Sequence, residues 1–379
     1  MKATIIGAGI GGLTLAIALK KKGIEVEIFE ATTEFKRVGA GIVLAINAMQ
    51  IFDRLGMVNA LESAGNVLEG MEITNAKLNA LGTTEHQYFE SIYKLRNVAI
   101  HRATLHEVLL AELGKDVPLY LNKKLKSLEQ KNGINYLEFE DGTKHETVLL
   151  IGADGIHSAV RRAVYPNVKE RFAKQWCWRG VLDFALEPAY KQIAREALGR
   201  GVRFGIVPIA PKKVYWYACA SYKENAQTEL ANIPIEDHFK DFNPLVLQLI
   251  KATDPSKIIS AELGDLEPMD CWYKGNMVLM GDAAHATTPN MGQGANQAIE
   301  SAWVLSDCLT TEKDWSTAFA KYQQIRQSKA NEVVKTSWQI GQIMHLSNPV
   351  AAKLRDWMFW MTPNWVGRMQ LKKIFELGY

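Results

Sequence analysis

Near its N-terminus the chain reads Ile5-Ile6-Gly7-Ala8-Gly9-Ile10-Gly11-Gly12, directly after an apolar run typical of a buried strand. Gly7, Gly9 and Gly12 have the spacing GxGxxG. The first glycine allows a tight turn, the second lets the backbone approach a pyrophosphate, and the third lets helix and strand pack closely. The residues that follow predict a helix over 11–22, whose first amides would face the phosphates. The segment therefore predicts an α/β fold that binds an adenine dinucleotide.

An acidic residue completes this unit. Residues 24–29 predict a second strand, which ends at Glu30. A carboxylate roughly 20 residues beyond the glycines is placed to accept hydrogen bonds from the ribose hydroxyls of adenosine. The same carboxylate would repel a 2′-phosphate, so NADP is not the dinucleotide expected in this site.

The composition is that of an ordinary globular protein. The chain has 379 residues, 47% hydrophobic and 22% charged, enough for about two domains. Its net charge of +3 comes from dispersed residues and does not indicate a nucleic-acid partner. The four cysteines form no CxxC pair, so we expect neither disulfides nor a metal site, and a cytoplasmic location. We see no export signal and no apolar run near the ~18 residues of a membrane span.

A second motif lies far along the chain. It reads Gly281-Asp282-Ala283-Ala284-His285, and Pro289 and Gly292-Gln293-Gly294-Ala295-Asn296 follow it. Its aspartate comes after a strand-like run and can accept hydrogen bonds from ribityl hydroxyls. The glycine-rich helix start suits the negative charge of a reduced flavin. The two motifs together predict FAD, although the aspartate could instead cap a turn and the histidine is better explained as a turn-stabilising residue.

Three further segments carry a family resemblance: residues 37–44, residues 101–105 and residues 152–161. With them the chain resembles the FAD-dependent aromatic hydroxylases, the single-component (class A) flavoprotein monooxygenases, over nearly its whole length. The resemblance places residues 37–44 beside the isoalloxazine ring and implies that Arg102 contacts the FAD. It places residues 152–161, which include Asp154, near both the FAD and the nicotinamide. The residues alone leave two alternatives open: Arg102 as a surface residue and Asp154 as a helix cap.

The predicted FAD site gathers residues from all of these segments. No metal site is expected. The predicted cofactor-binding residues are Gly7, Gly9, Gly11, Gly12, Glu30, Ala31, Arg37, Val43, Arg102, Asp154, Asp282, Pro289, Gly292, Gly294, Ala295 and Asn296. The chain departs from the family at Glu300-Ser301, where many relatives have Glu-Asp, and we expect this to alter helix packing more than chemistry.

The middle of the chain predicts a β-rich region. Residues 202–208 and 214–218 read as the strands of a hairpin. The resemblance implies that this sheet covers the substrate, with Arg203 and Tyr215 as catalytic or substrate-binding residues. The alternative is that its aromatic residues only pack together. The segment Trp176-Cys177-Trp178-Arg179 lacks the Ile-Pro that follows the second tryptophan in flavin halogenases, which argues against halogenation.

The C-terminal part predicts helices. Residues 315–344 read as one long helix, and an aromatic-rich helical segment with a break at Thr362-Pro363 follows. We expect the aromatic stripe to pack against the substrate domain, because such stripes usually belong to a core. A helix on a membrane surface is the alternative, because basic residues flank the aromatic ones.

The resulting fold prediction is an α/β protein. A Rossmann-like FAD-binding domain of the para-hydroxybenzoate hydroxylase type carries an inserted, mainly β substrate domain and a C-terminal helical segment. The predicted divisions are residues 1–72, 100–175 and 269–346 for the FAD-binding domain, 73–99 and 176–268 for the substrate domain, and 347–379 for the C-terminal segment.

The resemblance also implies the activity. NADH or NADPH, as a transient co-substrate, would reduce the FAD, and oxygen would then form a flavin C4a-hydroperoxide that hydroxylates a small aromatic or heteroaromatic substrate. The protein would be a monomer or a homodimer. Three alternatives remain open: a flavin reductase of the geranylgeranyl-reductase type, an NAD-dependent dehydrogenase, and a non-catalytic flavin-binding sensor.

Overall fold

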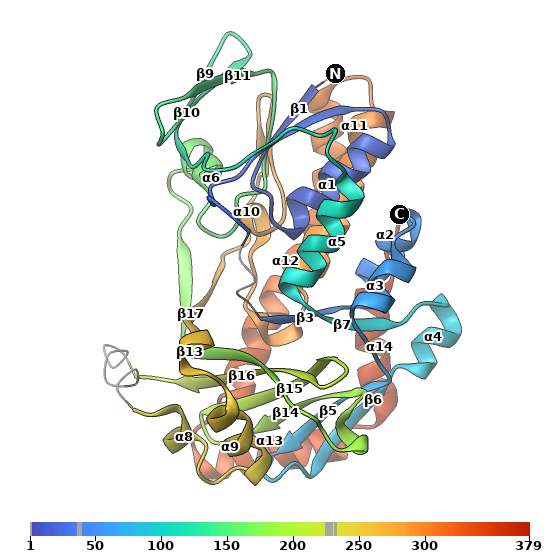
Figure 1. Ribbon diagram of the computed structural model, residues 1–379, viewed down its shortest axis with the longest axis vertical. Coiled ribbons are helices and arrows are strands. Elements are labelled where there is room, and N and C mark those ends of the chain that lie inside the picture. Colours follow the sequence, from blue (N-terminus) through green and yellow to red (C-terminus); the bar gives the residue numbers. More distant parts are fainter. Residues whose placement is uncertain (1, 36–39, 224–229, 231–232) are drawn as a thin grey trace.

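The computed structural model describes residues 2–35, 40–223, 230 and 233–379. A six-stranded sheet and its helices form one end of the molecule, and a seven-stranded sheet lies toward the other end (Figure 1). Helices and sheets alternate along the chain, so the predicted α/β class is confirmed. The predicted helix 315–344 is also confirmed, as α12 (Trp315–Met344).

The six-stranded sheet supports the N-terminal motif. Its strand order is β18-β19-β12-β1-β2-β8, and all neighbours are parallel except β18 and β19. The strand predicted from the apolar run before the glycines is confirmed as β1, and the predicted strand 24–29 is confirmed as β2. The strand bounds are Lys2–Ile6 (β1), Glu25–Phe29 (β2), Leu119–Tyr120 (β8), Leu149–Gly152 (β12), Tyr273–Lys274 (β18) and Met277–Leu279 (β19).

Helix α1 (Ile10–Lys21) is the predicted helix 11–22, shifted by one residue. It contacts α5 (Arg102–Leu113) and α11 (Gly294–Thr311), and nearly all of its residues from Ile10 to Leu19 are buried. A helix that is apolar on every side is stable only when it is covered on every side. The chain therefore brings the N-terminal and C-terminal motifs into one layer.

The seven-stranded sheet has the order β17-β13-β16-β15-β14-β5-β6, and only β14 and β5 pair in parallel. The predicted hairpin is confirmed as β15 and β16. The strand bounds are Gly70–Asn75 (β5), Ala80–Glu85 (β6), Glu170–Asp183 (β13), Ile193–Leu198 (β14), Val202–Ala210 (β15), Lys213–Ser221 (β16) and Ile259–Leu266 (β17).

Two small three-stranded sheets complete the β structure. One has the order β3-β7-β4 and faces β15 of the large sheet, and the other has the order β11-β10-β9. The strand bounds are Gly41–Leu44 (β3), Asn66–Leu68 (β4), Asn97–His101 (β7), Leu125–Lys131 (β9), Ile134–Phe139 (β10) and Lys144–Thr147 (β11).

Short helices connect these layers. They begin where capping residues permit: the side chain of Asn243, for example, accepts a hydrogen bond from the Leu245 amide at the start of α9. The bounds are Ile46–Arg54 (α2), Val58–Ala64 (α3), Gln87–Tyr93 (α4), Ala159–Val164 (α6), Ile235–His238 (α8), Pro244–Ala252 (α9), Asp282–His285 (α10) and, for one 3₁₀ turn, Pro289–Met291 (η3).

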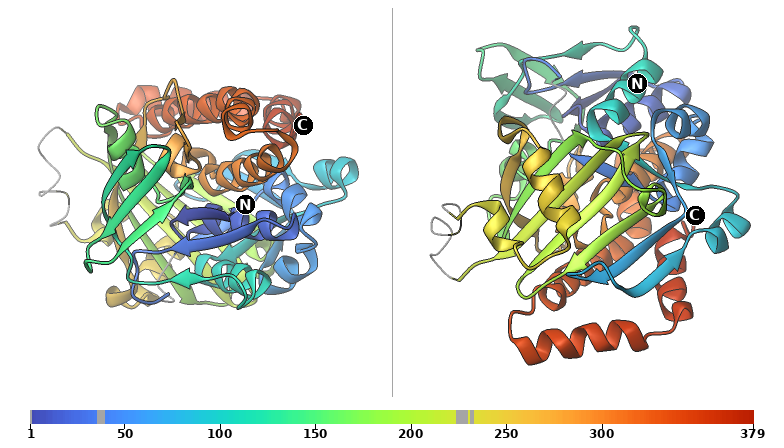
Figure 2. Two further views of the ribbon diagram at one scale, coloured as in Figure 1. Left: turned by 90° about the horizontal axis from the view of Figure 1, so that it is seen from above. Right: turned by 60° about the horizontal axis from the view of Figure 1, so that its bottom comes forward.

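The C-terminal segment forms α13 (Pro349–Met361) and α14 (Asn364–Phe375), with the predicted break between them. The expectation that its aromatic stripe packs as core is wrong for most of the stripe, because Trp357, Trp360 and Trp365 are exposed. Figure 2 shows α13 along one edge of the molecule and α14 turning away from it. Within the described parts of the chain, no helix is both long and apolar enough to span a membrane.

Candidate functional site

The glycine turn after β1 has almost no room for side chains. A Cβ atom on Gly7 would lie 2.4 Å from the carbonyl oxygen of Ala153, and one on Gly12 would lie 2.1 Å from the carbonyl oxygen of Gly7. Gly7 also has a φ of +106°. Gly9 differs, because a Cβ atom there would meet nothing within 4 Å. The open space beside Gly9, at the N-terminal end of α1, is where a pyrophosphate would approach.

The two distant motifs meet at Gly11. A Cβ atom on this residue would lie 3.1 Å from the Cβ of Ala298 in α11 and 3.2 Å from the Cε of Met280. Helices α1 and α11 therefore pack through a residue without a side chain. The structure thus places the glycine turn beside the segment that begins at Gly281.

Glu30 ties the end of β2 to the glycine turn. Its Oε2 accepts a hydrogen bond from the Ala8 amide at 2.7 Å, and its Oε1 accepts one from the Thr32 amide at 2.9 Å. Glu30 is half-buried and Ala31 next to it is exposed. Each carboxylate oxygen can accept a further hydrogen bond, so the ribose role predicted for Glu30 is compatible with this geometry.

Sequence reasoning missed a neighbour of this turn. His106, from α5, places its Nε2 at 2.8 Å from the carbonyl oxygen of Ala8. It follows Arg102 by one helical turn, which is the signal that could have drawn attention to it.

Asp282 is exposed to solvent, although its neighbours in the sequence, Gly281 and residues 283–286, are buried. Pro289 and Gly292 are exposed like Asp282, and Gly294 and Ala295 are half-buried. A Cβ atom on Gly294 would lie 4.0 Å from Oδ1 of Asp282, so the carboxylate and the start of α11 border one space. The surrounding protein raises the pKa of Asp282 by desolvation, and the positive charge of Arg102 acts in the opposite direction. The fold has therefore brought Arg102 and Asp282, predicted from separate segments, into one electrostatic environment.

Asn296 holds the glycine-rich turn in place. Its side chain is fully buried, and its Oδ1 accepts a hydrogen bond from the Ala45 amide at 3.0 Å. Its Nδ2 donates to the carbonyl oxygens of Val43, at 3.1 Å, and Gly292, at 2.8 Å. Asn296 thus joins β3 to the turn before α11, and its direct contact with the cofactor stays a prediction.

Asp154 contributes to the capping of α6, although the N-cap residue itself is Ser158. Its Oδ2 accepts hydrogen bonds from the amides of Ala159, at 2.7 Å, and Val160, at 3.2 Å, and its Oδ1 accepts one from Ser158. Burial raises the pKa of Asp154, and these hydrogen bonds oppose the rise. A cofactor contact of this side chain stays a prediction. Arg37 lies outside the described residues.

The large sheet meets the predicted flavin site through Arg203. This residue is 2% exposed, and its Nη1 donates to Oε1 of Glu196 at 2.9 Å. Its Nη2 donates to Oδ1 of Asn290. Asn290 lies in η3, the turn that ends directly before Gly292. Burial works against the charged form, but the negative charge of Glu196 raises the pKa of Arg203. Sequence reasoning missed Asn290, although it lies inside the segment that was singled out.

Tyr215 lies on the face of the sheet that meets β3. A Cβ atom on Gly41 would lie 2.6 Å from its ring, so glycine at that position permits the contact. Burial is the main cause that raises the pKa of Tyr215. The ring belongs to a small apolar cluster between the sheet layers, whose buried members are Leu68, Ala99, Ala194, Val207, Ile209 and Tyr215.

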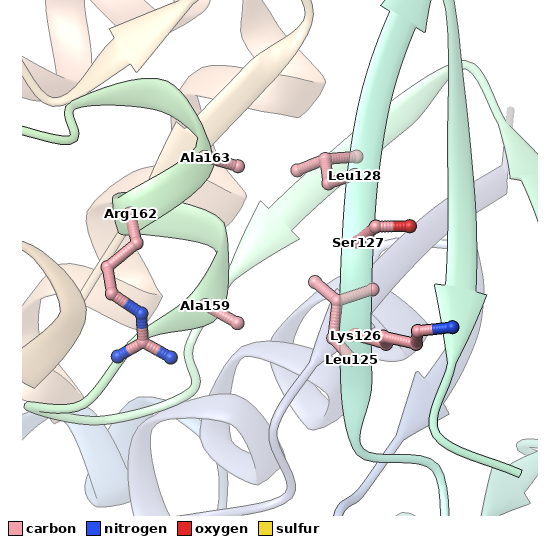
Figure 3. A pocket seen from close by; sticks show the side chains of 7 residues that line it. All are labelled: Leu125, Lys126, Ser127, Leu128, Ala159, Arg162 and Ala163. Atoms are coloured by element: carbon pink, nitrogen blue, oxygen red, sulfur yellow. The ribbon is translucent and has the colours of Figure 1, made fainter.

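A pocket between two other elements has none of the predicted cofactor residues in its lining. Figure 3 shows it between β9 and α6. Its lining includes Leu125, Ser127 and Arg162 but none of the predicted cofactor residues. We therefore assign it no part in the site.

The residues present fit an extended dinucleotide with a flavin end. The open backbone at Gly9 suits a pyrophosphate, and the half-buried Glu30 suits a ribose. The accessible Asp282 and the start of the 18-residue helix α11 suit ribityl hydroxyls and a negatively charged ring. These groups come from the two ends of the chain, which only the fold brings together.

Comparisons with known proteins agree with this geometry. Residues 1–337 match the family described as FAD binding domain. The chain is 37% identical to the aurachin C monooxygenase/isomerase of Stigmatella aurantiaca, covering 93% of this chain and 92% of that protein. It is 31% identical to the 2-heptyl-3-hydroxy-4(1H)-quinolone synthase of Pseudomonas aeruginosa, covering 99% of this chain and 98% of that protein. It is also 31% identical to the FAD-dependent urate hydroxylase of Klebsiella pneumoniae, covering 91% of both chains.

Solved structures show the same fold. HpxO of Klebsiella pneumoniae, complexed with FAD and uric acid, superposes with a TM-score of 0.87 at 27% identity, covering 99% of this chain and 96% of that chain. A salicylate hydroxylase substrate complex has a TM-score of 0.78 at 22% identity, covering 100% and 96%. At that lower identity the likeness concerns the fold alone.

Proposed function

The chain belongs to the FAD binding domain family and is a FAD-dependent monooxygenase, and we propose that it hydroxylates a quinolone-type ring that carries an apolar side chain. FAD and NADH or NADPH are its cofactors, as the sequence predicted. The dehydrogenase, reductase and sensor alternatives do not agree with relatives that are named monooxygenases.

The overall reaction needs two electrons from outside the substrate. One oxygen atom of O₂ enters a C–H bond of the ring and the other leaves as water, while NAD(P)H and a proton supply the reducing equivalents. Bound FAD supplies the electron transfer and the activation of oxygen. The protein's own residues bind, orient and shield the reactants.

We assign the protein's contributions from the contacts described above. The amides at the start of α11 favour negative charge on the flavin ring. Asp282 is assigned to the ribityl chain and Glu30 to the adenosine ribose. Asn296 is assigned to hold the turn before α11 against β3. Arg203 is assigned to orient the substrate, because its buried guanidinium joins that sheet to the turn at Asn290.

The proposed substrate class rests on the chemistry of the side chains that lie between the sheets. The cluster around Tyr215 is aliphatic apart from its tyrosine, and Val43 and Tyr217 pack against it. An apolar wall suits an alkyl or prenyl substituent better than a polar ring such as urate. The two relatives named for aurachin C and for a heptyl quinolone are consistent with this preference.

We further propose a cytoplasmic location. The four cysteines are free thiols, and Cys177, Cys219 and Cys308 are buried, as in proteins of a reducing compartment. A monomer or a homodimer stays our expectation for the assembly, and so do the domain boundaries given above.

The test is a comparison of four substrates. The FAD-loaded protein would be supplied with NADH or NADPH, ¹⁸O₂ and, in turn, 2-heptyl-4(1H)-quinolone, urate, salicylate or 3-amino-4-hydroxybenzoate. We expect the quinolone to accelerate coenzyme oxidation most and to gain one ¹⁸O atom. Preference for urate would reject the substrate class, and coenzyme oxidation without labelled product from any compound would count against the hydroxylation itself.

A further inference from the structure

The outward face of α13 is apolar. Its exposed large side chains are Val350, Leu354, Trp357, Met358, Trp360 and Met361, each between 54% and 66% exposed. A surface helix of a globular protein normally turns polar residues outward. The helix has 13 residues and is about 20 Å long, so the face is a continuous strip rather than a set of isolated side chains.

The opposite face of α13 fixes this orientation. Arg355 is 3% exposed and donates from Nη1 to the carbonyl oxygen of Met344 at 2.8 Å and from Nη2 to that of Gly199 at 3.0 Å. It also pairs with Asp356. Rotating the helix to hide its apolar face would expose these contacts and leave two carbonyl oxygens without their donor. The apolar strip is therefore a fixed part of the surface.

Helix α14 continues the strip and then becomes basic. Trp365 and Met369 are 62% and 61% exposed, and the exposed Lys372 and Lys373 follow. Figure 2 shows α13 along the edge of the molecule, with α14 rising from its end. The lysines thus lie one to two helical turns, roughly 5–12 Å, farther along α14 than the exposed apolar pair. Lys373 also pairs with Glu332.

A lipid surface suits this sequence of side chains. Tryptophan rings favour the interface between acyl chains and headgroups, and lysines extend toward lipid phosphates. We propose that α13 and the start of α14 dock on an anionic lipid bilayer, with the tryptophan and methionine side chains in the outer acyl region and Lys353, Lys372 and Lys373 at the level of the phosphates. The helices lie on the bilayer and do not cross it, because α13 is shorter than the roughly 30 Å hydrocarbon layer.

A second copy of the chain suits the face less well. Lys353 lies within the apolar strip, and Asp356, the only acidic residue of α13, is directed to Arg355. A two-fold contact through α13 would bury Lys353 from both copies without an acidic partner on that helix. A bilayer lets the same lysine reach solvent and phosphate. The charge pattern therefore favours lipid.

The test is sedimentation of the full-length, FAD-loaded protein with vesicles. We expect binding to vesicles that contain phosphatidylglycerol, weaker binding to pure phosphatidylcholine, and loss of the difference at high salt. Trp357→Ser with Trp360→Ser should reduce partitioning about tenfold or more. Lys353→Gln with Lys372→Gln should reduce it only on the anionic vesicles. Because the replaced side chains are exposed, thermal unfolding should change little.

Matched control variants distinguish this proposal from non-specific binding of the protein to vesicles. Phe172→Ser removes an exposed aromatic residue of β13, and Lys144→Gln removes an exposed charge of β11; neither should alter vesicle binding. Light scattering without lipid would show whether the native chain dimerises. If the native chain forms a dimer and the variant with Trp357→Ser and Trp360→Ser is a monomer, the proposal is overturned in favour of an interface between two copies. Failure of the native chain to bind either vesicle, or binding that survives the tryptophan changes, would also overturn it.

Discussion

Arg203 and Asn290, 87 residues apart in the sequence, are joined by a hydrogen bond from the guanidinium Nη2 to the amide Oδ1. The bond connects β15 of the large sheet to the turn that leads into α11. The same guanidinium pairs with Glu196, and both partners are 2% exposed. Arg203 therefore links the buried ion pair of the large sheet to the turn at the predicted flavin site.

Arg203→Gln should lower both activity and stability. The substitution leaves the buried Glu196 carboxylate unpaired, which we expect to cost about 3 kcal/mol in the free energy of unfolding, measured in urea. The double variant Glu196→Gln/Arg203→Gln should recover much of that stability but little of kcat/KM, because the cation is still missing. If the double variant recovered full activity, Arg203 would have no role beyond neutralising Glu196.

Gly9→Ala and Gly12→Ala should affect the protein differently. A methyl group at Gly12 would clash with the Gly7 carbonyl oxygen, so we expect a lower melting temperature even before FAD is added. A methyl group at Gly9 has open space in the free protein, so its effect should be confined to FAD affinity. Calorimetric unfolding of the apoprotein and fluorescence titration with FAD would measure the two effects. Equal FAD affinity of Gly9→Ala and native protein would contradict the pyrophosphate assignment.

Gly41→Ala should disturb Tyr215. The added Cβ would lie 2.6 Å from the ring, and we expect roughly 1–3 kcal/mol of destabilisation. Tyr215→Ala should relieve the clash, so the two changes should be strongly non-additive in a double-mutant cycle measured by chemical unfolding. Tyr215→Phe keeps the ring and tests the hydroxyl alone through kcat/KM. Strict additivity of the first two changes would show that the contact does not form.

Stability should fall in mildly acidic solution because of two buried histidines. Burial lowers the pKa of both His285 and His345 to about 3, below the model-compound value of about 6.5. The unfolded chain therefore binds protons that the folded protein does not as the pH falls from about 6.5 toward 3, and each histidine contributes up to roughly 1.4 kcal/mol of lost stability per pH unit.

Urea unfolding between pH 7 and pH 4.5 would measure this slope. His285→Gln and His345→Gln should each flatten it. The raised pKa values of Asp154 and Asp282 act in the opposite direction, so the comparison must be made between variants rather than on the native protein alone. A slope unchanged in both buried variants would contradict the assignment.

The local part of the fold could be predicted from the sequence. The strand, glycine turn, helix and acid around Gly7 follow one another within a short segment, and each follows from local backbone requirements. Asp282 could be singled out as a candidate residue in the same way, because it directly follows a strand within a short segment. The bridge from Arg203 to Asn290 was not, because it depends on which strand faces which turn.

Two other residues show why the remaining assignments could not be predicted. A carboxylate before a short helix can either cap it or face a ligand, and at Asp154 the sequence is compatible with both. The stripe that contains Trp357 has the periodicity of a buried face, and periodicity does not reveal whether anything covers it. The exposure of its side chains and the burial of Arg355 on the opposite face show that the stripe points outward.

The strands of the large sheet come from two separate parts of the chain, Gly70–Glu85 and Glu170–Leu266, with β14 and β5 side by side at their junction. A gene segment that carried this whole sheet would also carry residues 86–169, which include α5 with Arg102 and β12 of the six-stranded sheet. Exchange of the sheet as a unit would therefore also replace part of the cofactor-binding frame. Divergence by accumulated point substitutions at positions such as those around Tyr215, on an unchanged cofactor-binding frame, is the route that the connectivity leaves open.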